Sequence, residues 1–346
     1  MSNEMIFVST LALMLLLLLR WGFRTLPGEE WQIIASLPVS KNISGEWRGI
    51  NLTYYGLLTA NAYVIAVAVF LVLMEAIHVP LEGTAIMTLS ILLICVPASR
   101  IVAIIVEKKR HTFTVGGASF VGIIMAPAAI LLINRILNSN IPIVPAMTAI
   151  AISYTLGEGT GRLACISFGC CYGRALADTH PLFQRCFGRY SFIFIGKTKK
   201  IAYERGLDGV KVVPIQAITA LLYCVTGIAA TLLFLMSHFT LAFMLTIAVT
   251  QGWRTFSEIL RADYRGERQI SSYQIMAIIS IILAAAVSLL FNSRVSGTES
   301  VTLGLASLTP PVLYSLIILW MAVFIHTGRS TITGSTITFH IHKDRV

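Results

Sequence analysis

The chain has 346 residues, of which 56% are hydrophobic and only 12% are charged, and its mean hydropathy is +0.80. A typical soluble domain carries about 25% charged residues. Because so few charges cannot cover a folded surface, we exclude a soluble globular protein and predict a polytopic membrane protein.

Nine apolar runs are long enough to cross a hydrocarbon core, which takes about 20 residues. In chain order they are 5–22, 52–77, 84–106, 114–137, 142–168, 213–236, 239–260, 270–291 and 301–325. No Lys or Arg precedes the first run and no small-residue cleavage site is evident, so we interpret it as an uncleaved anchor. The predicted fold class is all-α, a polytopic membrane helix bundle of about nine helices.

The apolar runs divide the chain into three predicted parts: an anchor helix with a polar linker over 1–51, a membrane domain over 52–291, and an extra C-terminal helix with a polar tail over 292–346. Within the linker, 30–38 is expected to lie along the membrane interface. The segment 173–212 has too few apolar residues for a core of its own, so we expect it to form a small extramembrane cap on the bundle. In the tail, 327–346, polar and apolar residues alternate, which predicts an extended segment.

Basic residues alternate strongly between successive loops. Of the 26 Lys and Arg residues, 21 lie in alternate loops, 2 lie in the remaining loops and 3 lie inside the predicted spans. By the positive-inside rule, this pattern places the C-terminus and the cap in the cytoplasm and the N-terminus outside. The basic residues do not cluster on one water-facing element, so the net charge of +10 does not indicate nucleic-acid binding.

A charge inside a membrane span costs roughly 2.5–3.5 kcal/mol on insertion scales, so each one needs a partner or a function. Five ionisable residues lie within or at the ends of the apolar runs: Arg100, Glu158, Arg162, Arg254 and Glu258. Glu158 with Arg162, and Arg254 with Glu258, have the i, i+4 spacing of neighbours on one helix face. Either each pair merely neutralises itself, or the arginines also hold an anion in a polar site.

Glycines are frequent around the first of these pairs. Residues 157–174 read GEGTGRLACISFGCCYGR. A helix broken here would free backbone N–H groups beside guanidinium groups, which is a good cradle for a phosphate. Alternatively, the glycines form a close-packing interface between helices. A second glycine-rich stretch, 115–122, follows a basic turn and is a weak motif by itself.

Four of the six cysteines lie close together in the sequence: Cys165, Cys170, Cys171 and Cys186. With His180 they could bind zinc, but the spacing lacks the paired C-x2-C of a zinc knuckle. A thiolate activated by Arg162 or Arg174 could relay an acyl or diacylglyceryl group. The thiols could also be inert packing groups near a tight turn. On this pattern we assign no metal and no cofactor.

The residues around the two arginine pairs resemble a known family, the prolipoprotein diacylglyceryl transferases. Gly161-Arg162 through Gly173-Arg174 is similar in spacing to that family's signature G-R-[IL]-G-N-F-x-N-G-E-x-[WY]-G-R. Arg254-x-x-x-Glu258 resembles its second motif, R-F-x-x-E-F-x-R. The resemblance covers roughly 50–290, and further matching positions follow in the family's order: Tyr55-Gly56, Arg100, Gly116-Gly117-x-Ser119-Phe120, Pro214-x-Gln216 and Gln274.

The resemblance implies a helical bundle in the bacterial cytoplasmic membrane, with a central polar cavity that opens sideways to lipid. It implies phosphatidylglycerol as the donor, transfer of the diacylglyceryl unit to a nucleophile, and departure of glycerol phosphate. Arg162 and Arg254 would bind the phosphate and stabilise the leaving group, and Glu258 would orient Arg254. The lipid- or phosphate-binding set would comprise Tyr55, Arg100, Gly116, Gly117, Ser119, Glu158, Gly161, Cys165, Gly169, Tyr172, Gly173, Arg174 and Gln216.

The chain departs from the family pattern where the acceptor would be handled. The family's histidine in G-G-x-S-F-H-G is Val121, and the histidine of H-P-x-Q is Val213. The signature's asparagines are Cys165 and Phe168, and its glutamate is Cys170. We therefore expect related lipid chemistry on an acceptor that the sequence does not identify, with Cys170 or Cys171 as a candidate nucleophile or substitute polar group.

Two questions stay open at this stage. The family's cap faces the periplasm, whereas the charge pattern places 173–212 in the cytoplasm.

The alternative function is a lipid or anion transporter whose arginines bind substrate without chemistry. A purely structural bundle is a third possibility.

Overall fold

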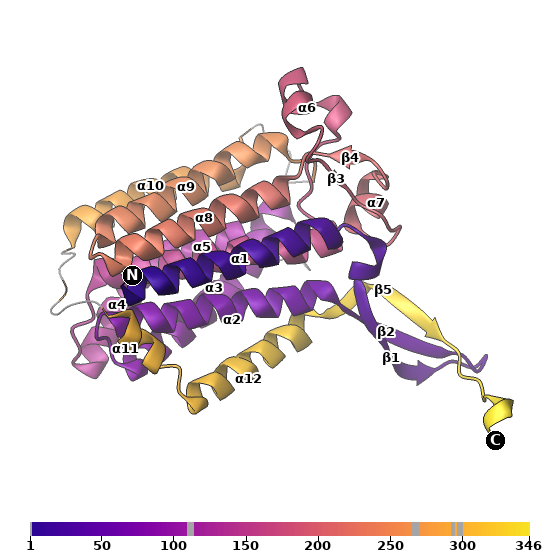
Figure 1. Ribbon diagram of the computed structural model, residues 1–346, viewed down its shortest axis with the longest axis horizontal. Coiled ribbons are helices and arrows are strands. Elements are labelled where there is room, and N and C mark those ends of the chain that lie inside the picture. The colour runs from indigo at the N-terminus through magenta and orange to yellow at the C-terminus, as the bar shows by residue number, and fades with distance from the viewer. Residues whose placement is uncertain (1, 109–113, 264–269, 292–294, 296–299) are drawn as a thin grey trace.

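The computed structural model describes residues 2–108, 114–263, 270–291, 295 and 300–346. Within these residues the chain forms helices α1 to α12 and strands β1 to β5 (Figure 1). The helices are α1 (Asn3–Thr25), α2 (Tyr54–Ala76), α3 (Leu81–Glu107), α4 (Val115–Leu137), α5 (Ile143–Phe168), α6 (Pro181–Phe187), α7 (Lys200–Arg205), α8 (Ile215–Leu235), α9 (Phe239–Leu260), α10 (Ser272–Leu290), α11 (Val301–Ala306) and α12 (Pro310–Thr327). The strands are β1 (Ile33–Lys41), β2 (Trp47–Thr53), β3 (Phe192–Ile193), β4 (Lys211–Val212) and β5 (Arg329–Ile337).

The long helices confirm the predicted all-α membrane bundle. Eight of the nine predicted spans each coincide with one long helix. Among the described helices, seven are long and apolar enough to cross a membrane: α1, α2, α3, α4, α8, α10 and α12. The two other long helices, α5 and α9, have 26 and 22 residues and carry the two Glu–Arg pairs. The chain is a multi-pass membrane protein.

The ninth predicted span, 301–325, is not one continuous helix but two. The chain forms the short helix α11 and begins α12 only at Pro310, which is followed by Pro311. Proline has no N–H to donate and is tolerated in the first turn of a helix, so a double proline starts a new helix instead of continuing the previous one.

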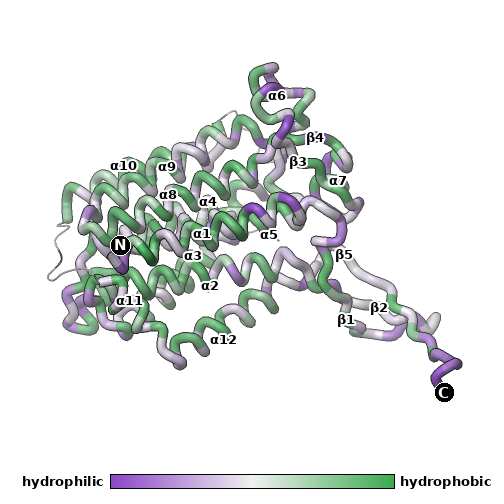
Figure 2. The backbone as a smooth tube through the Cα atoms, in the orientation of Figure 1, coloured by the Kyte–Doolittle hydropathy of each residue, from purple (hydrophilic) through white to green (hydrophobic). Residues whose placement is uncertain are grey.

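Helix α5 lies at the centre of the bundle and packs against α2, α8 and α9. About half of the apolar windows of α2 and α8 is buried (50% and 56%), whereas α3 and α12 are mostly exposed (17% and 11% buried). Apolar residues run along the helices in the tube view (Figure 2). The exposed apolar side chains on the outer helices are therefore the surface that faces lipid.

The glycines of α5 do not break the helix beside Arg162, so the first of the two interpretations given above is wrong at this position. A Cβ at Gly157 would lie 2.8 Å from Ala66 Cβ of α2, and a Cβ at Gly159 would lie 2.9 Å from Cys224 Sγ of α8. Both distances are too short for a real side chain. The glycines thus allow α2 and α8 to approach α5 closely, which is the alternative interpretation. The helix ends later, at Gly169, which has a left-handed φ of 70°.

The extramembrane elements gather at one end of the bundle. The cap contains α6, α7 and the β3–β4 pair (Figure 1), and a small apolar cluster at its base includes Leu176, Val213 and Leu260. The antiparallel sheet β1-β2-β5 also lies at this end. The predicted extended tail is confirmed as β5, which pairs with β2. The 30–38 segment belongs mainly to β1 of this sheet.

Figure 1 shows the C-terminus, the cap and the sheet at one end, and the N-terminus with α11 at the other. Three of the basic segments counted above therefore lie together: the 23–51 linker, the cap and the C-terminal tail. Among the described residues, these three basic segments share one end of the bundle.

Candidate functional site

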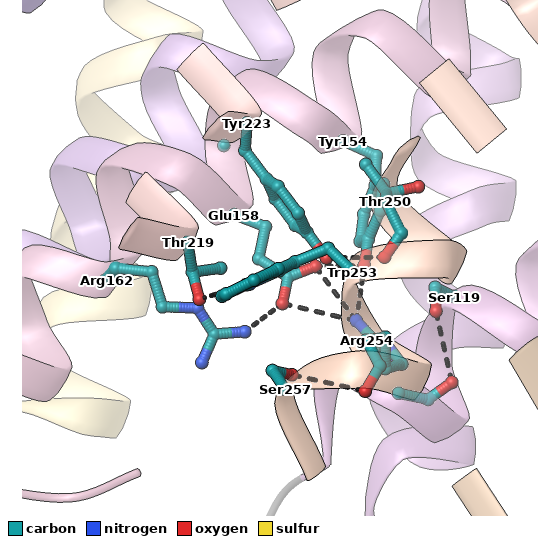
Figure 3. A network of polar contacts seen from close by, with 12 residues as sticks. Ser119, Tyr154, Glu158, Arg162, Thr219, Tyr223, Thr250, Trp253, Arg254 and Ser257 are labelled. Atoms are coloured by element: carbon teal, nitrogen blue, oxygen red, sulfur yellow. Dashed lines mark hydrogen bonds and ion pairs between the residues drawn. The ribbon is translucent and has the colours of Figure 1, made fainter. Parts of the chain in front are cut away.

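Glu158 of α5 lies at the centre of a buried polar network (Figure 3). Its side chain is only 3% exposed. The carboxylate accepts hydrogen bonds from the Tyr154 hydroxyl and from Arg162 Nη2, both on α5. It also accepts from Arg254 Nη2 of α9, which lies 3.0 Å from Glu158 Oε2. One carboxylate therefore joins two guanidinium groups from two helices.

The period of α5 explains why these groups meet. Tyr154, Glu158 and Arg162 are spaced four residues apart, so they lie one above another on the same helix face. Helix α9 packs against α5 and brings Arg254 to the middle of this row. Arg254 Nη2 also donates to the Tyr154 hydroxyl at 2.8 Å. The phenol thus holds both the carboxylate and the guanidinium.

Gly116 of α4 provides the space for the Arg254 guanidinium. A Cβ at this position would collide with Arg254 Nη1 and would lie 3.0 Å from the Tyr273 ring of α10. Ser119 Oγ donates to the Gly116 carbonyl at 3.1 Å (Figure 3). Gly117 faces α3, where a Cβ would meet Val102. The predicted glycine pair therefore has two distinct packing roles.

A second set of polar contacts joins α8 to α9 beside the network. The Tyr223 hydroxyl donates to the Thr250 carbonyl at 2.9 Å, and Trp253 Nε1 donates to Thr219 Oγ1 at 2.8 Å. These bonds fix the helix that carries Arg254. Figure 3 shows Tyr223 and Trp253 among the side chains drawn around the network.

Sequence reasoning missed Tyr154, Tyr223, Thr219 and Trp253. The sequence could have revealed Tyr154, because it lies four residues before Glu158, just as Arg162 lies four residues after it. The others have no comparable signal. Their partners lie on other helices, so local spacing carries no information about them.

The network carries an excess of positive charge. Arg162 and Arg254 share a single carboxylate, which leaves one positive charge uncompensated within this trio. The two arginine side chains are only 12% and 10% exposed. Arg162 Nε is buried and has no hydrogen-bond partner among the described residues. A buried donor without a partner costs free energy until something accepts from it, and an anion would do so.

The three cysteines of the signature segment come together at the end of α5. The Sγ atoms of Cys165, Cys170 and Cys171 all lie within 4.8 Å of one another. Cys171 lies outside the helix, and hydrogen bonds from the thiols of Cys165 and Cys170 lower its pKa, with Arg261 and Arg162 contributing. Tyr55 of α2 packs beside them, with its ring centroid 5.6 Å from that of Phe168.

Gln216 and three of the predicted glycines hold the backbone around this segment. Gln216 is fully buried, and its Nε2 donates to the Cys170 carbonyl at 2.8 Å. Gly169 caps α5. A Cβ at Gly173 would collide with the Val213 carbonyl, and a Cβ at Gly161 would make ordinary contact with Ala62 at 3.5 Å. Gly173 therefore allows close packing, Gly169 allows the left-handed cap and Gln216 contributes a hydrogen bond, whereas the contacts at Gly161 do not require a glycine.

Other predicted site residues lie away from the Glu158 network. Arg100 is exposed on α3. Tyr172 is buried, and its hydroxyl donates to Glu204 of the cap at 2.8 Å. Arg174 is exposed and lines an extramembrane pocket of about 480 Å³ together with Arg205 and Arg261.

Glu258 lies one turn beyond Arg254 on α9. The carboxylate that holds Arg254 Nη2 at 3.0 Å is Glu158. Arg261, which follows α9, has a raised pKa: burial lowers it, but Asp263, Cys171 and Glu258 raise it by more. The Glu258 carboxylate thus acts on Arg261, and its expected role in orienting Arg254 stays a prediction.

The chain is similar in sequence to one described family. No curated protein matches the chain significantly. A family model, described as prolipoprotein diacylglyceryl transferase, matches residues 43–290. This match spans most of the chain and includes α5 and α9, which supply the Glu158 network. The chain belongs to the prolipoprotein diacylglyceryl transferase family of membrane lipid transferases.

Proposed function

We propose that the protein cleaves an anionic glycerophospholipid, phosphatidylglycerol, and transfers its diacylglyceryl or a related lipid-derived group to an acceptor. The observation that carries the proposal is the sharing of one carboxylate, Glu158, by two buried arginines. Family membership supports the class of reaction. We further propose that the protein acts in the cytoplasmic membrane of a bacterium, with membrane phospholipid as its partner and without a role for nucleic acid.

The charge of the network fits a lipid phosphate. A phosphodiester carries one negative charge, which would balance the single excess positive charge of Arg162, Glu158 and Arg254. Arg162 Nε would supply a donor to a phosphate oxygen. Since the network is buried among apolar helices, its interaction with an anion is strengthened by the low local dielectric constant.

The same groups would favour bond breaking over simple binding. The acceptor nucleophile forms a bond to the diacylglyceryl carbon, the bond from that carbon to the phosphate oxygen breaks, and glycerol phosphate leaves with the electron pair. The nucleophile loses its proton to solvent or to a base. Negative charge on the phosphate grows during this step, so fixed guanidinium groups stabilise the transition state more than the bound lipid.

The acceptor is proposed to differ from that of the typical family member. Val121 and Val213 replace the two histidines of the family pattern, and Cys165 and Cys170 replace polar positions of its signature. The phosphate-binding arginines are retained while the groups on the acceptor side are changed. This division supports a common donor and a different acceptor.

A lipid or anion transporter is the second candidate, and Val121 is the observation that favours it. Without the family's histidine at this position, the site lacks a familiar base to activate an acceptor. In a transporter, Arg162 and Arg254 would bind the phosphate and release it without breaking a bond.

Membranes containing the overproduced protein separate the two functions. The membranes are incubated with phosphatidylglycerol labelled in its glycerol headgroup, and labelled glycerol phosphate is measured in the aqueous phase. The transferase releases this product; Arg162→Ala and Arg254→Ala abolish the release, and Arg135→Ala, an exposed control on α4, keeps it. Saturable lipid binding with no product in any variant supports the transporter and contradicts our proposal.

A further inference from the structure

The thiols of Cys165, Cys170 and Cys171 form a cluster that the lipid chemistry above does not use. Their Sγ atoms lie within 4.8 Å of one another, and all three residues are partly exposed. The other three cysteines are elsewhere: Cys95 is partly exposed on α3, Cys186 is exposed in the cap, and Cys224 is buried on α8. Half of the six cysteines of the chain therefore lie in one cluster.

A tight turn brings the three residues together. Gly169 ends α5 in the left-handed conformation, with φ at 70°. The Cys170 N–H then donates to the Cys165 carbonyl at 3.0 Å. This is the 6→1 hydrogen bond of a Schellman motif, which often ends a helix. Cys171 is itself left-handed, with φ at 56°. The chain therefore folds back so that residues 170 and 171 return to the side of residue 165.

Neighbouring elements hold this turn on several sides. Gln216 of α8 donates to the Cys170 carbonyl at 2.8 Å. The Ile201 N–H donates to the Gly169 carbonyl at 3.0 Å, and the Ala262 N–H donates to the Tyr172 carbonyl at 3.1 Å. Three separate segments thus fix the backbone around the thiols. Such support is what a preorganised ligand site requires.

The surroundings of the cluster are positively charged and contain an unsatisfied acceptor. The guanidinium groups of Arg261 and Arg162 lie near enough to Cys171 to interact with it electrostatically. Gln216 Oε1 is buried and has no hydrogen-bond partner among the described residues. The nearby guanidinium charges would offset part of the negative charge of three ligating sulfurs, and Gln216 Oε1 can accept one further hydrogen bond.

We propose that Cys165, Cys170 and Cys171 bind one Zn²⁺ ion through their three sulfur atoms, with a fourth position open to water or substrate. Thiolates are preferred ligands of Zn²⁺, and three protein ligands with an open fourth position are typical of catalytic zinc sites. With Zn–S bonds of about 2.3 Å, tetrahedral geometry places the sulfurs about 3.8 Å apart. The sulfur atoms already lie within 4.8 Å of one another, so each pair needs to approach by no more than about 1 Å to reach this distance.

The sequence pattern indicated no metal, but the fold brings the three thiols into one cluster. Sequence spacing alone showed no C-x2-C pair, but the turn at Gly169 brings together residues that the spacing separates. Three thiolates with Zn²⁺ carry one net negative charge, which Arg162 and Arg261 stabilise. The proton of each ligating thiol is released to solvent on binding.

Metal analysis of the purified full chain in detergent tests the proposal. The reduced, chelator-treated protein is loaded with Zn²⁺, dialysed and analysed for metal. One Zn²⁺ per chain is expected. Cys165→Ser, Cys170→Ser and Cys171→Ser should each weaken Zn²⁺ binding by at least about 100-fold, more than the loss of an outer-shell partner, whereas Cys186→Ser keeps wild-type affinity.

If a serine variant fails to fold, the proposal can still be tested on the wild-type chain by measuring how far Zn²⁺ protects the thiols from alkylation. Zn²⁺ should slow alkylation of residues 165, 170 and 171 and leave alkylation of Cys186 unchanged, as read by mass spectrometry. Equal alkylation with and without Zn²⁺, or a disulfide within the cluster in the Zn²⁺-loaded protein, would overturn the proposal. Neither measurement uses lipid turnover, so the result is independent of the function proposed above.

Discussion

Glu158 and Arg254 are 96 residues apart in the chain, yet their side chains meet at 3.0 Å inside the membrane bundle. Arg162, the partner that helical spacing provides, contacts the same carboxylate. The contact with Arg254 joins α5 to α9, so that one carboxylate forms ion pairs with two guanidinium groups. The proposed lipid chemistry rests on this shared carboxylate, which also provides a polar contact between α5 and α9.

Replacing the shared carboxylate should destabilise the protein strongly. Glu158→Gln leaves two guanidinium groups close together with no anion between them. Removing one partner of a buried ion pair typically costs 3–5 kcal/mol, so we expect a loss of about 3 kcal/mol. Thermal unfolding in detergent measures the effect, and Glu82→Gln, on an exposed carboxylate, should leave the melting temperature unchanged. Equal melting temperatures for both variants would contradict the central role of Glu158.

Tyr154 should act as a positioning residue for the lipid reaction. Tyr154→Phe removes the hydroxyl that donates to Glu158 and accepts from Arg254. Hydrogen bonds to charged groups contribute about 1.5–3 kcal/mol, so turnover of phosphatidylglycerol should fall at least about 10-fold. The loss should appear in kcat more than in KM. Tyr314→Phe, at an exposed position on α12, should keep both constants, and an unchanged kcat for Tyr154→Phe would argue against the positioning role.

Gly116 and Gly252 should respond oppositely to alanine. A Cβ at Gly116 would collide with Arg254 Nη1, whereas a Cβ at Gly252 meets nothing within 4 Å. Gly116→Ala should lower stability by about 1–3 kcal/mol through overpacking. Gly252→Ala should raise it by up to about 1 kcal/mol, because alanine favours the helix. Thermal unfolding of the two variants checks the contrast, which fails if Gly116→Ala unfolds at the wild-type temperature.

Lys199 should make stability depend on pH in the alkaline range. Its side chain is fully buried and donates to the carbonyls of Leu26 and Ser167 at 3.1 and 2.7 Å. Burial lowers the pKa of Lys199 from 10.5 to about 8. Between these values the unfolded chain binds more protons than the folded one, so this residue's contribution to stability increases as pH rises.

The measurement for Lys199 is a difference between melting curves. The melting temperature of the wild type minus that of Lys199→Met should increase from pH 8 to pH 10. Lys211→Met, at an exposed position in the same cap, should track the wild type over this range. A difference that stays constant with pH would show that Lys199 has no lowered pKa.

The exposed thiol of Cys186 offers a test of membrane orientation. The cap that contains it lies at the same end as the C-terminus (Figure 1), and the basic residues predict that this end faces the cytoplasm. A membrane-impermeant maleimide should therefore label Cys186 only after intact cells are permeabilised. Cys186→Ser gives the background signal. Labelling in intact cells would place the cap outside, as in the typical family member.

The sequence alone was sufficient for the features that local patterns encode. The bounds of the apolar runs agree with the bounds of the long helices to within about three residues. The double proline at Pro310 and Pro311 explains the one run that is split into two helices. The i, i+4 spacing identified Glu158 with Arg162. The order of the Gly and Arg positions identified the family. Each of these signals depends only on residues that are close in the chain.

The tertiary structure decided everything that depends on how the helices face one another. Only packing of α9 on α5 brings Arg254 to Glu158, and only the close approach of α2 and α8 explains the unbroken, glycine-rich α5. The three thiols meet because a left-handed Gly169 reverses the chain. Helix rotation, crossing and turn conformation are set by the summed packing of the whole bundle, so no local spacing reveals them.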